Sequence, residues 1–251
     1  MLRLLLWATA LSNLVAGAPV ADCSSKAPAF FLAGDSTTAI DGGWGNGLLA
    51  PLVKPAWGVN VGKSGATTAS FRAGGYWNNV TQHVKDNKDK YDVYVTISFG
   101  HNDQKSTSGI TLDQFKANLI KFANEIKSLG GTPLMTTSLT RRVFPSGQDH
   151  SATDSLHDQR LAAIAAAEAT GSTVIDLNNA SLKYVNAIGK AAANEYNYGA
   201  DKKDTTHLNP HGEVVFGRMM ADLIIRAKPC LEKHFTPDQA LSNKIWNNQP
   251  A

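Results

Sequence analysis

The sequence predicts a three-layer α/β domain in which a five-stranded parallel sheet lies between two layers of helices. Two observations carry this prediction. Short β-rich runs recur at wide spacing, and each is followed by enough chain for a helix. The chain also contains no repeat, no low-complexity linker and no break in composition, so we expect one domain over residues 22–251.

The predicted strands are short runs bounded by Gly, Pro or polar residues, at positions 29–33, 57–61, 93–99, 133–138 and 173–177. Helix starts are marked by capping residues. Thr111 and Gln114 form a capping-box pattern before an apolar periodic segment. Asp154 is expected to cap a second helix, and Asn209-Pro210 reads as the cap and first position of the last helix, about 211–227.

The N-terminus resembles a secretory signal peptide over residues 1–18. Arg3 precedes an apolar stretch at 4–15, and small residues follow at 16–18. A buried N-terminal helix is the weaker alternative. We therefore expect a secreted, extracellular protein in which Cys23 and Cys230 form a disulfide, with two separate buried thiols as the alternative. Asn79 and Asn179 begin N-glycosylation triplets, which matter if the host is eukaryotic.

The charges are nearly balanced, with 24 Lys and Arg against 21 Asp and Glu, and they are scattered along the chain. This pattern predicts neither a nucleic-acid partner nor a membrane partner. No second long apolar stretch follows the first one. We expect a monomer.

Polar residues that suit ester chemistry follow several predicted strands. Ser36 ends the first strand in "FLAGDSTT", although Gly-Asp-Ser is also a common turn composition. A serine nucleophile needs a base. "DTTH" supplies one just before the last helix, where Asp204 can fold back and fix the tautomer of His207. Gly65 and Asn102 follow two further predicted strands, where a backbone N–H and a side-chain amide can hold an oxyanion.

Each motif alone has an ordinary structural explanation: a turn, a glycine loop, a locally bonded asparagine or a surface aspartate. His207 and His211 also lie four residues apart, as metal ligands often do. The sequence offers no HExxH motif, no clustered cysteines and no obvious third ligand, so we predict no metal and no cofactor.

Taken together, the order Ser…Gly…Asn…Asp-x-x-His resembles the SGNH hydrolase superfamily over residues 29–227. Within it, "LAGDST", "GWGNGL", "GHND" and "DTTHLNPHGEVV" look most like rhamnogalacturonan acetylesterases. The resemblance implies a flavodoxin-like sheet in the order 2-1-3-4-5. It also implies a Ser36–His207–Asp204 triad, an oxyanion hole from Ser36, Gly65 and Asn102, and removal of O-acetyl groups from the rhamnogalacturonan of pectin without a cofactor.

The sequence departs from that family in its second block, where arginines are common and this chain has "GATTA". Arg141 and Arg142 are the predicted substitutes for binding a uronate carboxylate, and Trp44 is predicted to stack on a sugar ring. Further candidates for these roles are Lys63, Arg72, Tyr76 and Trp77. Two other functions stay open: a lipase or lysophospholipase of the same superfamily, and a non-catalytic carbohydrate-binding protein.

Overall fold

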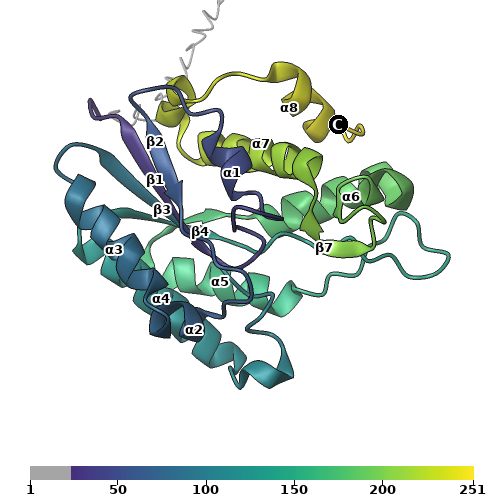
Figure 1. The fold of residues 1–251 in the computed structure, drawn as a ribbon, viewed down its shortest axis with the longest axis horizontal. Coiled ribbons are helices and arrows are strands. Elements are labelled where there is room, and N and C mark those ends of the chain that lie inside the picture. The colour runs from purple at the N-terminus through teal and green to yellow at the C-terminus, as the bar shows by residue number, and fades with distance from the viewer. Residues whose placement is uncertain (1–23) are drawn as a thin grey trace, which may run out of the picture.

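A computed structural model describes residues 24–251, and its centre is a five-stranded sheet in which all strands are parallel. The strands lie in the order β2-β1-β3-β4-β5, which confirms the predicted topology (Figure 1). Their bounds are β1 Pro28–Gly34, β2 Trp57–Asn60, β3 Asp92–Ser98, β4 Thr132–Thr136 and β5 Thr173–Ile175.

Helices cover both faces of the sheet, as predicted (Figure 1). One face carries α2 Thr68–Ala73, α3 Tyr76–Asn87, α4 Leu112–Ser128 and α5 His157–Thr170. The other carries α1 Gly45–Leu49, α6 Leu177–Asn194, α7 Pro210–Ala227 and α8 Gln239–Trp246. Two short 3-10 helices, η1 Ser106–Ser108 and η2 Pro229–His234, complete the helical elements.

Strand β1 shows why the sheet strands read as continuous apolar runs. Every residue of β1 is buried. Phe30 and Leu32 pack into the core on the α7 side, whereas Phe31 and Ala33 pack into the core on the α4 side. A parallel strand covered on both faces needs apolar side chains at every position, so the pattern is continuous rather than alternating.

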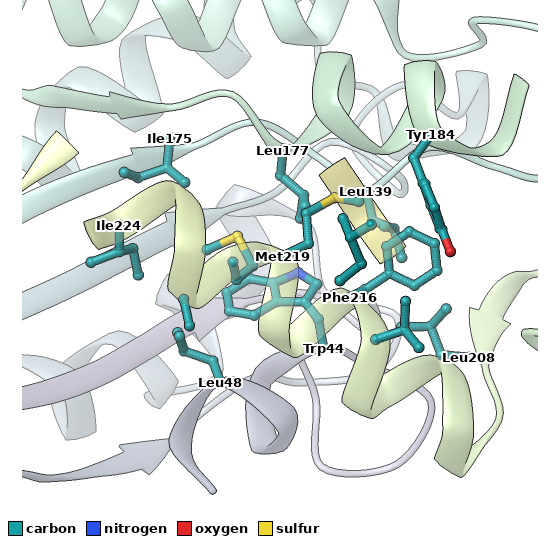
Figure 2. Close-up of a cluster of buried hydrophobic side chains, with 14 of the residues drawn as sticks. Trp44, Leu48, Leu139, Ile175, Leu177, Tyr184, Leu208, Phe216, Met219 and Ile224 are labelled. Carbon is teal, nitrogen blue, oxygen red and sulfur yellow. The ribbon is translucent and has the colours of Figure 1, made fainter. Parts of the chain in front are cut away.

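The core on the α7 side contains the aromatic residue that follows the first long loop. Figure 2 shows Trp44 packed among the side chains of this cluster, with Phe216 and Met219 of α7. Helices α1 and α7 are in close contact at Gly47. A Cβ added to Gly47 would lie only 2.0 Å from the carbonyl oxygen of Glu213. Gly47 of the "GWGNGL" segment therefore serves helix packing.

Helix starts agree with the sequence at two of three places. In α4 the Thr111 side chain accepts from Gln114 N and the Gln114 side chain accepts from Thr111 N, as the capping box predicts. Asn209 caps α7, with Pro210 as its first residue. The prediction that Asp154 caps a helix is wrong, because α5 begins at His157 and the Asp154 carboxylate contacts that imidazole at 3.3 Å instead.

A second, two-stranded antiparallel sheet was not predicted. Strands β6 Asn197–Tyr198 and β7 Asp204–Leu208 pair beside the carboxyl ends of the main strands (Figure 1). The "DTTH" motif therefore lies in a strand that was not among the predicted ones. We call the β6–β7 pair, residues 197–208, the ribbon.

Several predictions concern the N-terminus and are not tested. The signal peptide at 1–18 and Cys23 lie outside the described residues, so cleavage, secretion and the Cys23–Cys230 pairing stay predictions. In residues 24–251, the helices are too short or too polar for any of them to span a bilayer.

Candidate active site

The nucleophile candidate lies in a tight turn that directly follows β1. Gly34 is required there, because a Cβ at this position would lie 2.2 Å from Thr38 Oγ1. Asp35 then holds the turn, since its Oδ1 accepts from Thr37 N at 2.9 Å and from Thr37 Oγ1 at 2.8 Å. The Asn60 side chain donates to Thr38 O at 2.7 Å. Ser36 is fixed by this turn at the carboxyl edge of the sheet.

The acid–base pair comes from the ribbon and meets Ser36 in hydrogen-bonding geometry. His207 Nε2 lies 2.8 Å from Ser36 Oγ, and His207 Nδ1 lies 2.7 Å from Asp204 Oδ2. Asp204 Oδ1 also accepts from the backbone N–H groups of Thr206 and His207 at 2.9 and 3.0 Å. Partial burial alone would raise the pKa of Asp204, but these hydrogen bonds outweigh it and lower the pKa. The three predicted side chains are thus brought together as a Ser–His–Asp relay.

The ribbon is anchored by the segment that follows β4. Arg142 is almost fully buried, and its Nε donates to Asn197 Oδ1 while its Nη2 donates to His207 O, both at 2.6 Å. Its backbone N–H also donates to Thr205 O. Burial lowers the pKa of Arg142 to about 10, and Asp204 nearby opposes the shift. The guanidinium stays charged at neutral pH and fixes the backbone that carries His207.

The predicted oxyanion donors converge on the same edge. Asn102 Nδ2 donates to Ala66 O at 3.0 Å, which ties the loop after β3 to the loop after β2 and leaves one amide hydrogen free. Gly65 has φ +77°, a backbone region that favours glycine. No acceptor in residues 24–251 takes up the backbone N–H of Ser36 or of Gly65. These groups can therefore donate to a developing negative charge.

A pocket of about 320 Å³ opens over the triad. Its lining residues are mostly polar: Ser36, Asp41, Gly42, Ser64, Gly65, Asn102, Lys105, Tyr198, Asp204 and His207. Sequence reasoning missed four side chains of this pocket, those of Asp41, Ser64, Lys105 and Tyr198. Lys105 Nζ donates to Asn102 Oδ1 at 2.7 Å, and Tyr198 Oη donates to Asp41 Oδ2 at 3.1 Å. The position of Lys105 just after "GHND" was a usable signal, whereas Tyr198 and Asp41 carried none.

Two predicted substrate contacts are corrected by the structure. Trp44 has no exposed surface and belongs to the core, so it cannot stack on a sugar (Figure 2). Arg142 is 1% exposed and serves the ribbon, so it cannot bind a polymer. Both errors arise because a residue near the binding edge in sequence can point inward.

The other substrate-contact candidates have protein partners. Half-buried Arg141 donates to Thr206 Oγ1 at 3.3 Å and to Ser155 Oγ at 3.0 Å, and it does not line the pocket. Its contact with substrate stays a prediction. The Arg72 guanidinium pairs with Glu125 at 3.0 Å. Trp77 is 1% exposed and is a core residue.

The predicted glycosylation sites both lie in helices. Asn79 is exposed on α3, whereas Asn179 is partly buried on α6, and their occupancy stays a prediction. Within residues 24–251, His, Cys, Asp and Glu side chains nowhere gather in a group of three or more suited to a metal ion.

Two fully buried ionisable groups lie beside the site. Burial raises the pKa of Asp35 to about 6, because the hydrogen bonds from Thr37 only partly offset the loss of solvent. Burial lowers the pKa of His101 to about 3, so its imidazole is neutral, and its Nε2 contacts Leu139 O at 2.9 Å. Both groups belong to the scaffold under the loops that carry Ser36 and Asn102.

Comparison with known proteins agrees with this geometry. The sequence model of the GDSL-like Lipase/Acylhydrolase family matches residues 32–214, which include all members of the relay and the oxyanion candidates. Rhamnogalacturonan acetylesterase RhgT of Bacillus subtilis (strain 168) is 28% identical over 209 residues, covering 76% of this chain and 87% of that protein.

Solved structures share the fold. YxiM of Bacillus subtilis has a TM-score of 0.69 at 22% identity over 80% of this chain, which spans only 57% of that protein's chain. The acetylxylan esterase Axe2 of Geobacillus stearothermophilus has a TM-score of 0.57 at 20% identity, covering 82% of this chain and 95% of that one. A lipase/acylhydrolase from Enterococcus faecalis has a TM-score of 0.55 at 21% identity, covering 84% and 99%.

Proposed function

Because the chain belongs to the GDSL-like Lipase/Acylhydrolase family and is a carboxylic ester hydrolase, we propose that it removes O-acetyl groups from rhamnogalacturonan outside the cell. The observation that carries the proposal is the pocket of about 320 Å³ over Ser36, whose lining residues are polar or glycine and include no aliphatic side chain. An acetyl group needs little apolar surface. A long acyl chain needs an apolar groove, so the pocket favours the acetylesterase over the lipase reading.

The proposed reaction is a two-step acyl transfer. His207 Nε2 takes the proton of Ser36 Oγ as this oxygen attacks the acetyl carbonyl carbon. The carbonyl π electrons move onto its oxygen, which the N–H groups of Ser36 and Gly65 and the Asn102 amide stabilise. Collapse of this intermediate breaks the bond to the sugar oxygen, which leaves with the proton from His207. The product is an acetyl ester on Ser36.

The second step reverses the roles with water as the nucleophile. His207 takes a proton from water as the oxygen attacks the acetyl-enzyme, and the proton then returns to Ser36 Oγ as acetate leaves. Asp204 orients His207 through the 2.7 Å contact to Nδ1 and stabilises the imidazolium formed in each step. No step requires a cofactor.

Support for the polysaccharide comes from the resemblance of the motifs and from the similarity to the rhamnogalacturonan acetylesterase RhgT. The structural similarity to Axe2 concerns the fold and makes acetylated xylan the natural comparison substrate. Secretion of the protein is part of the proposal, because a cell-wall polymer is met outside the cell and residues 1–18 resemble a signal peptide.

The experiment measures acetate release from acetylated rhamnogalacturonan, acetylated xylan and acetylated mannan. We expect the highest kcat/KM on rhamnogalacturonan. The Ser36→Ala variant should release no acetate and keep the melting temperature of the wild type, because it removes only one oxygen atom from a pocket-lining side chain. A residual activity within a few-fold of wild type would remove Ser36 from the mechanism. Preference for 4-nitrophenyl palmitate over 4-nitrophenyl acetate would favour the lipase instead, and no activity on any ester would favour a binding protein.

A further inference from the structure

Lys105 occupies a defined place at the mouth of the pocket. Its backbone N–H donates to Asn102 O at 3.2 Å, and its ammonium group donates to Asn102 Oδ1 at 2.7 Å. The residue is exposed and lines the pocket. A lysine ammonium has three donors, so two remain for a ligand. The side chain is therefore held in one place while keeping its capacity to bind an anion.

Charge is distributed unevenly around this pocket. Lys105 is the one cationic side chain among the lining residues, whereas Asp41 and Asp204 are acidic. The two carboxylates already have partners, since Asp204 accepts from His207 and Asp41 accepts from Tyr198. A negatively charged substituent in the pocket is attracted by Lys105 and repelled by the acidic residues, so the side of the pocket that carries Lys105 favours it.

Neither Arg141 nor Arg142 lines the pocket where an anion would bind. Arg142 is buried under the ribbon, and Arg141 is bonded to Thr206 and Ser155 outside the pocket. Lys63 is exposed on the loop after β2, but its ammonium lies 5.5 Å from the centre of the Tyr76 ring, and it does not line the pocket.

We propose that Lys105 binds the carboxylate of a uronate residue at or next to the acetylated sugar, and so determines specificity for an acidic polysaccharide. This inference rests on the proposed function and names the group that recognises its substrate. The Asn102 amide links the two sites: its oxygen accepts from Lys105, and its nitrogen, which donates to Ala66 O, keeps one hydrogen for the proposed oxyanion. A carboxylate on Lys105 is thus one amide group away from the reacting ester, a separation that substituents of one sugar or of adjacent sugars can span.

The test uses a pair of substrates that differ only in charge. One is an acetylated rhamnogalacturonan oligosaccharide with free carboxylates, and the other is its methyl ester. 4-Nitrophenyl acetate reports the chemistry without a sugar. Lys105→Ala should lower kcat/KM on the free acid about fivefold, mainly through KM, which corresponds to about 1 kcal/mol for an exposed ion pair. It should leave the methyl ester and 4-nitrophenyl acetate within twofold of wild type.

Lys105→Arg should restore most of the activity on the free acid, because it restores the charge. Lys63→Ala is the matched control, which removes the same charge from a neighbouring loop and should not alter the ratio between acid and ester. Raising the salt concentration should lower wild-type kcat/KM on the acid and not on the ester, since ions screen an exposed pair.

Three results would overturn the inference. Equal losses on all three substrates would mean that Lys105 only positions Asn102. Unchanged kinetics on all three substrates would mean that Lys105 neither positions Asn102 nor binds a carboxylate. Equal kcat/KM of the wild-type enzyme on the free acid and on its methyl ester would exclude carboxylate recognition, while the acetylesterase function would stand. The proposed function itself fails on a different observation, namely no acetate release from either oligosaccharide by the wild-type protein.

Discussion

Replacing Asp35 by asparagine should change the free energy of unfolding, relative to the wild type at the same pH, more favourably in mild alkali than in acid. Asp35 is fully buried, and burial raises its pKa from the ordinary value of 3.8 to about 6. The folded protein therefore holds the proton more tightly than the unfolded chain does. The resulting stability is present in full below pH 3.8 and is lost as the pH rises through 6, because the folded state must then accommodate a buried carboxylate.

The magnitude follows from the two pKa values. The difference between 3.8 and about 6 corresponds to a cost of about 3 kcal/mol at pH 8. At pH 4 the same relation gives about 0.5 kcal/mol, because the group is protonated in the folded state and half protonated in the unfolded one. The change in unfolding free energy caused by Asp35→Asn should therefore be more favourable at pH 8 than at pH 4 by about 2.5 kcal/mol.

The wild-type stability curve alone conceals this effect. Burial lowers the pKa of His101 from 6.5 to about 3, so this residue contributes stability that is lost as the pH falls through 6.5. Between pH 4 and pH 6 its slope is opposite to that of Asp35. Comparing Asp35→Asn with the wild type at each pH cancels the contribution of His101, because that residue is present in both proteins.

The assay is urea unfolding followed by tryptophan fluorescence at pH 4 and pH 8, with coincident circular-dichroism transitions as the check for two-state behaviour. Asp89→Asn is the matched control, since Asp89 is exposed, and it should change the free energy little at either pH. A change for Asp35→Asn that is the same at both pH values would refute the reasoning, because it would mean that folding leaves the ionisation of Asp35 unperturbed.

Three further substitutions test the site. Asn102→Ala should lower kcat on 4-nitrophenyl acetate on the order of 10²–10³-fold, as loss of one oxyanion donor does elsewhere, and a change below threefold would exclude it from the oxyanion hole. Arg142→Met should abolish activity on every ester and lower the unfolding free energy by about 3 kcal/mol, because Asn197 and His207 lose a charged donor. Normal stability, with loss of activity on the polymer alone, would mean that Arg142 contacts the substrate after all. Tyr198→Ala should lower kcat/KM on the polysaccharide and spare 4-nitrophenyl acetate, because an exposed pocket aromatic offers a stacking surface; equal losses on both would indicate that it positions His207 instead.

The sheet could be predicted from the sequence because its strands are buried on both faces. Continuous apolar runs such as the one in β1 leave few alternatives, and the capping residues at Thr111 and Asn209 mark helix starts through local hydrogen bonds. The topology came from the family resemblance and not from the pattern. The ribbon could not be predicted, because β6 has two residues and its pairing with β7 carries no apolar signal.

The side chains proposed as relay and oxyanion donors could be expected to lie close together, because each follows a strand or precedes a helix and the carboxyl edge of the sheet brings them together. The direction in which each side chain points could not be predicted from the sequence. Trp44 and Arg142 lie near that edge in sequence, yet both point inward, the first into the core and the second under the ribbon. Lys105 could have been found from its position just after "GHND", whereas Tyr198 reaches the pocket from β6 through tertiary packing, which no local pattern encodes.

The relay is divided between two structural units, with Ser36 on the main sheet and His207 on the ribbon. The ribbon is docked by bonds from Arg141 and Arg142, by the Tyr198–Asp41 bond and by the backbone bond from Leu208 N to Gly42 O at 2.9 Å. The Leu208 side chain is also buried in the core on the α7 side. Opening of the ribbon would separate His207, the proposed base, from Ser36, the proposed nucleophile, while the sheet stays folded. Inactivation by heat should therefore precede loss of the fold, and amide hydrogens of residues 197–208 should exchange with solvent before those of β1 and β3. The temperature at which the enzyme loses activity is then set by the stability of the contacts between the ribbon and the rest of the domain. Variants selected for activity at high temperature should therefore accumulate substitutions at these contacts and not in the core.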